Sequence, residues 1–232
     1  MIISDNLSRV LESIESARIK AGRTDRVTLV GVSKTHPASA VRAAFAAGLT
    51  DFGENRMQEA LPKIAEADIL AVWHLVGHLQ SNKAKKAALA FDWIHSIDSH
   101  ETGTLVARAA DQAGRSVRIL LEVNTSGEES KHGVPPERAL PLAEALAPLD
   151  GRGIVIAGLM TVGPLGGDEA ANRRAFALLR SLRDRIQSLI PGCSELSMGM
   201  SGDFTSAILE GSTMVRVGSA IFGARTYPEA AQ

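Results

Sequence analysis

Lys34 lies where a lysine could do chemistry, directly after the short apolar stretch 27–33, VTLVGVS. A lysine at the end of a buried strand can hold a phosphate, act as a general base or form a Schiff base, and partial burial lowers the pKa of its ammonium toward that of a reactive amine. Pro37 follows at once and suits the first turn of a helix. We therefore expect Lys34 where a parallel strand passes to its crossover helix, the usual place for active sites in α/β folds. From this stretch alone, a lysine that reaches into solvent is an equal alternative.

Two turns near the C-terminus carry glycines and serines in a pattern that suits an anion. They are 198–203, MGMSGD, and 216–220, RVGSA. Glycines let backbone N–H groups approach an anion, Ser201 and Ser219 add hydroxyl donors, and a helix after each turn would present its positive end. Either turn alone is more often simply a tight turn. Together, at the last two predicted strands, they predict a phosphate site, because (β/α)8 barrels frequently bind phosphate there.

Arg216 begins the second of these turns and suggests which phosphate compound could bind. Pyridoxal 5'-phosphate (PLP) needs a Schiff-base lysine, an anion cradle and a partner for its pyridine nitrogen, and aspartate or arginine is the usual partner. Lys34, the two turns and Arg216 would supply all three. The alternative for Arg216 is an ion pair with an acid at the strand ends, such as Glu54 or Glu122.

Short apolar runs alternate with helical patterns along the chain. The runs predicted to be strands are 27–33, 50–53, 72–77, 93–96, 117–124, 154–161, 195–198 and 214–218. The helical patterns after them are 38–47, 57–67, 82–90, 100–113, 136–146, 169–189 and 204–210. Strands that alternate with single helices form parallel sheets, and eight of them favour a closed α/β TIM-type (β/α)8 barrel over an open doubly wound sheet.

An extra helix is predicted before the first strand. Leu7, Val10 and Ile14 recur at helical spacing, residues 4–6 offer caps, and Gly22 offers a stop. No linker or change of composition marks a second domain, so residues 1–232 are predicted to form one domain with a core at about 27–225.

A barrel places its functional side chains after the C-terminal ends of its strands, and polar residues do follow each predicted strand. They are Lys34; Glu54, Asn55 and Arg56; His78 and Gln80; His95 and Ser96; Asn124; Thr161; Ser201; and Arg216. Loops are polar in any fold, which explains any single member of this set. Lys34 and Arg216 are harder to explain in that way, because each interrupts apolar strand-end sequence, where an unpaired buried cation is costly.

Composition narrows the functional classes. The chain has 232 residues, with 25 Lys and Arg against 26 Asp and Glu, so no charge excess predicts a nucleic acid or membrane partner. Cys193 is the single cysteine and the N-terminus does not resemble a signal peptide, which together predict a cytoplasmic protein. We predict no metal site, because His74 and His78 lie within a strand and its turn rather than on a zinc-binding helix.

Seven segments of the sequence together resemble the pyridoxal phosphate homeostasis protein family, single-domain relatives of the alanine racemase barrel (fold-type III). They are VGVSKTHP, DFGENRMQE, WHLVGHLQSNK, LEVNTSGEESKHG, GLM, ELSMGMSGDF and GSTMVRVGSAIFG, in colinear order from about residue 27 to residue 225. The resemblance implies that the cofactor is PLP. It further implies that Lys34 forms the Schiff base, that Ser201, Gly218 and Ser219 hold the phosphate, that Arg216 faces the pyridine nitrogen, and that Asn55 is a further site residue. At positions 56 and 78, where this sequence has Arg56 and His78, some members of the family carry other residues.

The same resemblance implies a cofactor carrier or buffer that maintains vitamin B6 pools, with no established catalytic residue. It implies PLP-dependent apoenzymes as acceptors, and the single-domain outline predicts a monomer. Arginine beside the pyridine nitrogen agrees with low activity, because it opposes protonation of the ring. Two alternatives remain: a fold-type III enzyme such as a weak amino-acid racemase, and a lyase or aldolase that uses Lys34 without PLP. Racemisation would need a second base, and Tyr227 is the chain's single tyrosine.

Overall fold

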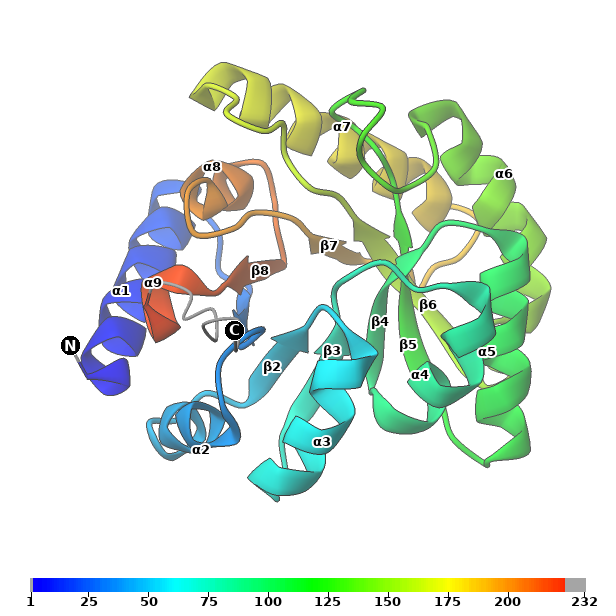
Figure 1. Cartoon of the computed structure of the whole chain (residues 1–232). Helices are drawn as coiled ribbons and strands as arrows, with labels where there is room; N and C mark the ends of the chain where they lie inside the picture. The colour runs from blue at the N-terminus through cyan, green and yellow to red at the C-terminus, as the bar shows by residue number, and fades with distance from the viewer. Residues whose placement is uncertain (1, 224–232) are drawn as a thin grey trace.

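The computed structural model describes residues 2–223, which form a closed barrel of eight parallel strands (Figure 1). Each strand pairs with the next along the chain, and β1 (Thr28–Val32) closes the barrel by pairing with β8 (Met214–Val217). The strands between them are β2 (Asp51–Glu54), β3 (Val72–Leu75), β4 (Trp93–Ile97), β5 (Val117–Glu122), β6 (Ile154–Met160) and β7 (Glu195–Ser197). All eight overlap the predicted ranges, so the predicted (β/α)8 barrel is confirmed.

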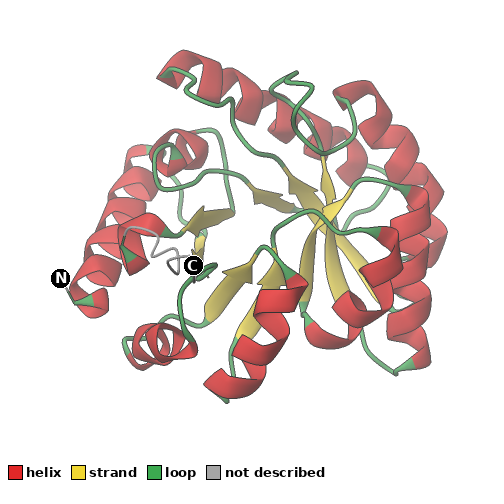
Figure 2. Ribbon diagram, viewed as in Figure 1, coloured by secondary structure: helices red, strands yellow, loops and turns green. Residues whose placement is uncertain are grey.

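Helices surround the strands on the outside of the barrel (Figure 2). Those that follow β1 to β8 in turn are α2 (Ala38–Ala46), α3 (Met57–Ala67), α4 (Ala84–Ala90) preceded by the 3₁₀ turn η1 (Ser81–Lys83), α5 (His100–Gln112), α6 (Pro136–Leu146) followed by η2 (Ala147–Leu149), α7 (Glu169–Gln187), α8 (Phe204–Leu209) and the short α9 (Ser219–Phe222). Between residues 2 and 223, no helix has both the length and the apolar character needed to cross a bilayer.

The extra N-terminal helix, α1 (Ile3–Lys20), packs beside α8 and α9 on the outside of the barrel (Figure 1). It buries Leu7, Val10 and Ile14 as the spacing predicts. The predicted caps at residues 4–6 are wrong: the helix begins earlier, with Ile2 as N-cap and no side-chain cap. Asn6 instead donates its side-chain amide to the backbone oxygen of Ile221, 2.9 Å away. The amide therefore links α1 to the helix that begins at the second glycine turn.

The apolar core has two parts. The larger lies between the strands and the surrounding helices, and a smaller cluster of Leu120, Ala157 and Met160 from β5 and β6 is separate from it. Polar side chains also lie in the barrel interior. The clearest sign is a hydrogen bond between His95 on β4 and Ser197 on β7, because those strands are not neighbours and the bond must cross the barrel.

Candidate functional site

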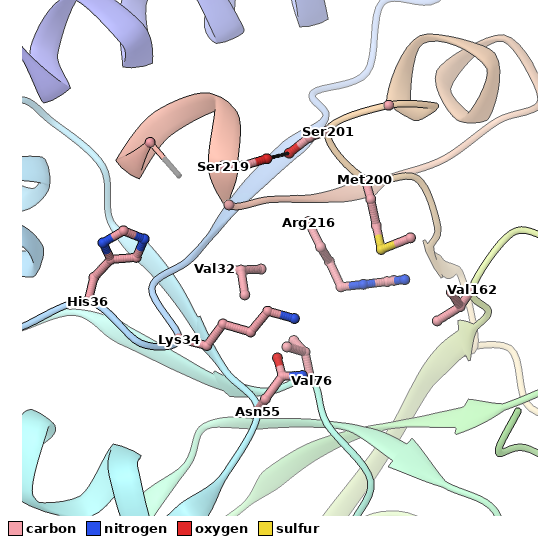
Figure 3. A pocket seen from close by; sticks show the side chains of 13 residues that line it. Val32, Lys34, His36, Asn55, Val76, Val162, Met200, Ser201, Arg216 and Ser219 are labelled. Atoms are coloured by element: carbon pink, nitrogen blue, oxygen red, sulfur yellow. Dashed lines mark hydrogen bonds between the residues drawn. The ribbon is translucent and has the colours of Figure 1, made fainter. Parts of the chain in front are cut away.

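A pocket of about 420 Å³ opens at the C-terminal ends of the strands (Figure 3). It gathers residues from the ends of β1, β2, β3, β6, β7 and β8, which only a closed barrel brings together. The residues that line it are Val32, Lys34, His36, Asn55, Val76, Val162, Met200, Ser201, Gly202, Arg216, Gly218, Ser219 and Gly223. All six residues predicted from the sequence to form the site, Lys34, Asn55, Ser201, Arg216, Gly218 and Ser219, are among them.

Lys34 lies two residues past β1, and its side chain points into the pocket (Figure 3). The next residue, Thr35, has a φ of +66°, a conformation that a β-branched residue rarely adopts and that costs about 1–2 kcal/mol. The Thr35 hydroxyl oxygen is buried and has no hydrogen-bond partner in residues 2–223. The strained turn therefore sits directly beside the lysine, where a backbone held in an unusual conformation is often functional.

A buried ion pair holds the backbone on the other side of Lys34. The Lys63 ammonium donates to the Ser33 backbone oxygen and to Glu54 Oε1, both at 2.7 Å, and the Ser33 hydroxyl donates to the same Glu54 oxygen at 2.6 Å. Burial raises the pKa of Glu54, while Lys63 and Ser33 oppose that rise. Glu54 was one of the predicted strand-end residues, and it supports the lysine's strand rather than lining the pocket. The residue that precedes Lys34 is therefore fixed through both backbone and side chain.

Asn55 follows β2 and is positioned by a close backbone approach. A side chain on Gly77 would bring its Cβ to 2.3 Å from the Asn55 backbone oxygen, so the position requires glycine. The Ser96 hydroxyl donates to the Gly77 backbone oxygen at 2.7 Å, which ties the loop after β3 to β4. These contacts place Asn55 beneath the end of Lys34 in Figure 3.

Arg216 is 5% exposed and its guanidinium is held by three hydrogen bonds. One terminal nitrogen donates to the backbone and hydroxyl oxygens of Ser197 at 2.7 and 2.6 Å, and the other donates to the Thr161 backbone oxygen at 2.8 Å. Burial lowers the pKa of Arg216 to about 10, so it remains a cation at neutral pH. The alternative of an ion pair with Glu54 or Glu122 is not found in residues 2–223, where Glu54 pairs with Lys63.

Behind Arg216, a chain of buried hydrogen bonds crosses the barrel. His95 Nδ1 lies 3.0 Å from the Ser197 hydroxyl, His95 Nε2 lies 2.9 Å from His74 Nδ1, and His74 Nε2 lies 3.1 Å from Asp51 Oδ1. Burial lowers the pKa of His74 and, more strongly, that of His95, so both rings are neutral. Because arginine can only donate, a consistent chain has Arg216 donating to Ser197, Ser197 to His95, His95 to His74 and His74 to Asp51. We call this series the interior chain.

The two glycine turns lie side by side at the pocket edge. The Ser219 hydroxyl donates to the Ser201 hydroxyl at 3.3 Å, although the two residues are 18 apart in sequence (Figure 3). A side chain at Gly218 would put its Cβ 3.0 Å from the Val32 backbone oxygen, a tight contact that favours glycine in this turn. The structure thus brings together the three residues predicted to hold a phosphate.

Other predicted strand-end residues lie elsewhere. Arg56, His78 and Gln80 line a neighbouring recess, while Asn124 and Thr161 line a third. His95 and Ser96 are fully buried rather than at the rim. Sequence reasoning did not select three of the pocket residues, His36, Val76 and Val162. His36 had one usable signal, its position two residues after Lys34. Tyr227 lies outside the described residues.

Comparison with known proteins shows which proteins this chain is similar to. Residues 6–226 match the family described as alanine racemase, N-terminal domain. A pyridoxal phosphate homeostasis protein of Pseudomonas aeruginosa is 44% identical over 227 residues, 97% of this chain and 96% of that protein. The structure of PipY from Synechococcus elongatus with PLP bound is similar with a TM-score of 0.82 at 38% identity, covering 95% of this chain and 100% of that one. An alanine racemase of Clostridium difficile has a TM-score of 0.73 at 16% identity, over 97% of this chain and 58% of the racemase, which shows the fold alone.

Proposed function

Because this chain belongs to the alanine racemase N-terminal domain family, and within it to the pyridoxal phosphate homeostasis proteins, we propose that it binds PLP in the pocket around Lys34. In this proposal Lys34 holds the cofactor as a Schiff base, and the protein stores and releases PLP with little or no catalytic turnover. The observation that carries the proposal is the convergence of Lys34, Arg216 and the two serine turns on one pocket. An amine, a partner for the ring nitrogen and an anion cradle are what PLP requires.

The pocket fits the cofactor in size and in donor chemistry. Its volume of about 420 Å³ lies within the range usual for small-molecule sites. The Ser201 and Ser219 hydroxyls and the backbone at Gly218 would hold the phosphate, because all three residues line the pocket and a glycine backbone can approach an anion closely.

Arg216 supports storage rather than turnover. When bound, PLP supplies an electron sink whose strength depends on protonation of its ring nitrogen. A guanidinium with a pKa of about 10 keeps its proton at neutral pH and opposes a second positive charge beside it. The interior chain strengthens this effect, because its donors all point away from Arg216 and offer the arginine an acceptor rather than a proton.

A weak amino-acid racemase is the second candidate, and His36 is the observation in its favour. Racemisation needs two bases, and His36 lines the same pocket as Lys34. Burial lowers the pKa of His36, with a smaller contribution from the Lys63 charge, so the imidazole is neutral and could accept a proton. Its ring contacts Phe222 at 5.3 Å between centroids, which holds it at the pocket edge.

The visible absorption spectrum tests the cofactor. Purified protein incubated with PLP is expected to show a yellow Schiff-base band that borohydride removes. Lys34→Ala should abolish the band, whereas Lys85→Ala, which removes an exposed lysine on α4, should leave it unchanged. A wild-type protein that stays colourless with PLP would contradict the proposal and favour an aldolase or lyase that uses Lys34 without PLP.

Proton exchange separates the two candidate functions. The PLP-loaded protein is incubated with L-alanine in D₂O, and loss of the α-proton is followed by NMR together with the D-alanine formed. The storage function predicts exchange close to the rate of free PLP. Rapid exchange that His36→Ala abolishes would establish the racemase instead. PLP-dependent apoenzymes as acceptors, a monomeric state and a cytoplasmic location remain predictions.

A further inference from the structure

Two histidines and an aspartate meet on the barrel rim, close to the pocket but outside it. His78 follows β3, Asp98 follows β4 directly, and His132 lies in the loop between β5 and α6. One potential ligand atom from each lies within 4.8 Å of the other two. His78 Nδ1 is 3.5 Å from Asp98 Oδ2, and the two imidazole rings stack with 4.0 Å between their centroids. We propose that His78, Asp98 and His132 bind a divalent transition-metal ion, and we call this group the rim cluster.

A buried carboxylate beside the rim cluster gives an independent reason to expect a cation. Glu122 lines the same recess as His78 and His132, is 8% exposed, and its Oε2 has no hydrogen-bond partner in residues 2–223. Burial raises the pKa of Glu122 to about 7, the nearby Asp98 charge adds to the rise, and the Arg216 charge opposes it. A buried carboxylate oxygen without a hydrogen-bond partner is stabilised by a cation bound in the same recess.

The donor set determines the class of ion. Two imidazole nitrogens and one carboxylate oxygen suit Zn²⁺, Co²⁺ or Ni²⁺ better than Mg²⁺ or Ca²⁺, which prefer oxygen ligands. Three protein ligands leave a coordination position for water or another ligand, the arrangement of an open zinc site. Ligand atoms around Zn²⁺ are about 3.3 Å apart, so the atoms here must close by an ångström or so. Both histidines are exposed and can rotate out of their parallel stack to do so.

A neighbouring lysine does not block the site. Lys131 precedes His132 and lines the same recess, and its charge would repel a metal ion. Its ammonium is instead turned toward Glu128, with which it forms a salt bridge, and toward the Gly163 backbone oxygen at 2.6 Å. Asp98 therefore keeps its carboxylate beside the two imidazole rings, and the Lys131 ammonium is held elsewhere. Its recess shares Asn55, Val76 and Val162 with the main pocket, so the ion would lie next to the bound cofactor.

Metal titration of the full chain tests the proposal. Zn²⁺ is titrated calorimetrically into the PLP-loaded protein, and Co²⁺ is added separately so that its visible d–d bands report nitrogen ligation. Wild-type protein is expected to bind one ion, and His132→Ala and Asp98→Asn should each weaken binding at least tenfold. His100→Ala removes an exposed histidine outside the cluster and should leave binding unchanged.

The variants also exclude competing explanations. Every variant carries the same PLP, so metal held by the cofactor's phosphate would be the same in all of them. Urea unfolding confirms that each variant is folded, which is expected because His132 is exposed. Absence of Zn²⁺ binding to the wild type, or binding that survives either His132→Ala or Asp98→Asn, would overturn the proposal.

Discussion

His74 and His95 contact each other inside the barrel, whereas His78 and His132 stack on its rim. The inner rings are fully buried, and every ring nitrogen of this pair has a partner in the interior chain. The outer rings are exposed, with Asp98 beside them and a recess in front. The difference in burial therefore gives the two histidine pairs different functions. The inner pair carries fixed hydrogen bonds that support Arg216, and the outer pair keeps lone pairs for a ligand.

Of the substitutions considered, removal of His95, the centre of the interior chain, should lower the free energy of unfolding most. His95→Ala leaves Ser197 and His74 without their partners in a site that water does not reach, and it opens a cavity. We expect a loss of about 3 kcal/mol in the free energy of unfolding, measured with urea. A loss below about 1 kcal/mol would show that the interior chain contributes little to stability.

Glu122 and the inner histidines, His74 and His95, should change the free energy of unfolding in opposite directions as the pH falls. Burial raises the pKa of Glu122 to about 7 from 4.5, so the folded state binds the extra proton between these values and gains stability as the pH falls. His74 and His95 act oppositely: their pKa values lie below 6.5 in the folded state, so the unfolded state binds protons first and stability falls on acidification. Glu122→Gln removes the compensating gain. Between pH 7.5 and 5 it should steepen the loss of stability by about 2 kcal/mol relative to wild type. An unchanged slope would show that Glu122 titrates normally.

Ser197→Ala tests the link between the interior chain and Arg216. The substitution removes one acceptor from the guanidinium but leaves the backbone oxygens of residues 197 and 161. We expect a loss of about 1 kcal/mol in unfolding free energy and weaker PLP binding in a spectroscopic titration. Ser197→Thr keeps the hydroxyl and should restore much of the binding if the hydrogen bond is what matters. Equal PLP affinity in the alanine variant and the wild type would show that the interior chain does not influence PLP binding.

His132→Ala should have the smallest effect on stability in the absence of metal. Its ring is exposed and stacks on another exposed ring, so the expected change is below about 0.5 kcal/mol. Added Zn²⁺ should then stabilise the wild type and not this variant, because ligand binding to the folded state raises its stability. Unfolding curves with and without Zn²⁺ give the comparison directly. A destabilisation as large as that of His95→Ala would show that the outer histidine pair supports the fold as much as the inner pair does.

The barrel and its main site follow from the sequence because their signals are local. Strands buried on both faces give continuous apolar runs, and the strand ends then identify Lys34, Arg216 and the two turns. Contacts across the barrel have no such signal. His95 was predicted at the rim, yet its side chain is buried inside the barrel and bonds to Ser197, 102 residues away. The start of α1 was wrong for a related reason: Asn6, one of the predicted caps, bonds across to the Ile221 backbone oxygen of α9, 215 residues away, and the helix begins at Ile3.

The pairing of the histidines shows the same limit. His78 was weighed against His74, its neighbour in sequence, although the two rings belong to different sets in the structure. His74 joins His95 in the interior, and His78 meets His132 from a loop 54 positions along the chain. Nothing in the spacing of either residue indicates that contact, which depends on where the loop after β5 returns to the rim.

Peptide mapping after borohydride reduction tests the central claim most directly. PLP-loaded protein is reduced, digested and examined by mass spectrometry, with Lys34→Ala treated in the same way. The account predicts one phosphopyridoxyl group, on the peptide that carries Lys34, and none in the variant. A label on another lysine in the wild type, or a full label in Lys34→Ala, would contradict it.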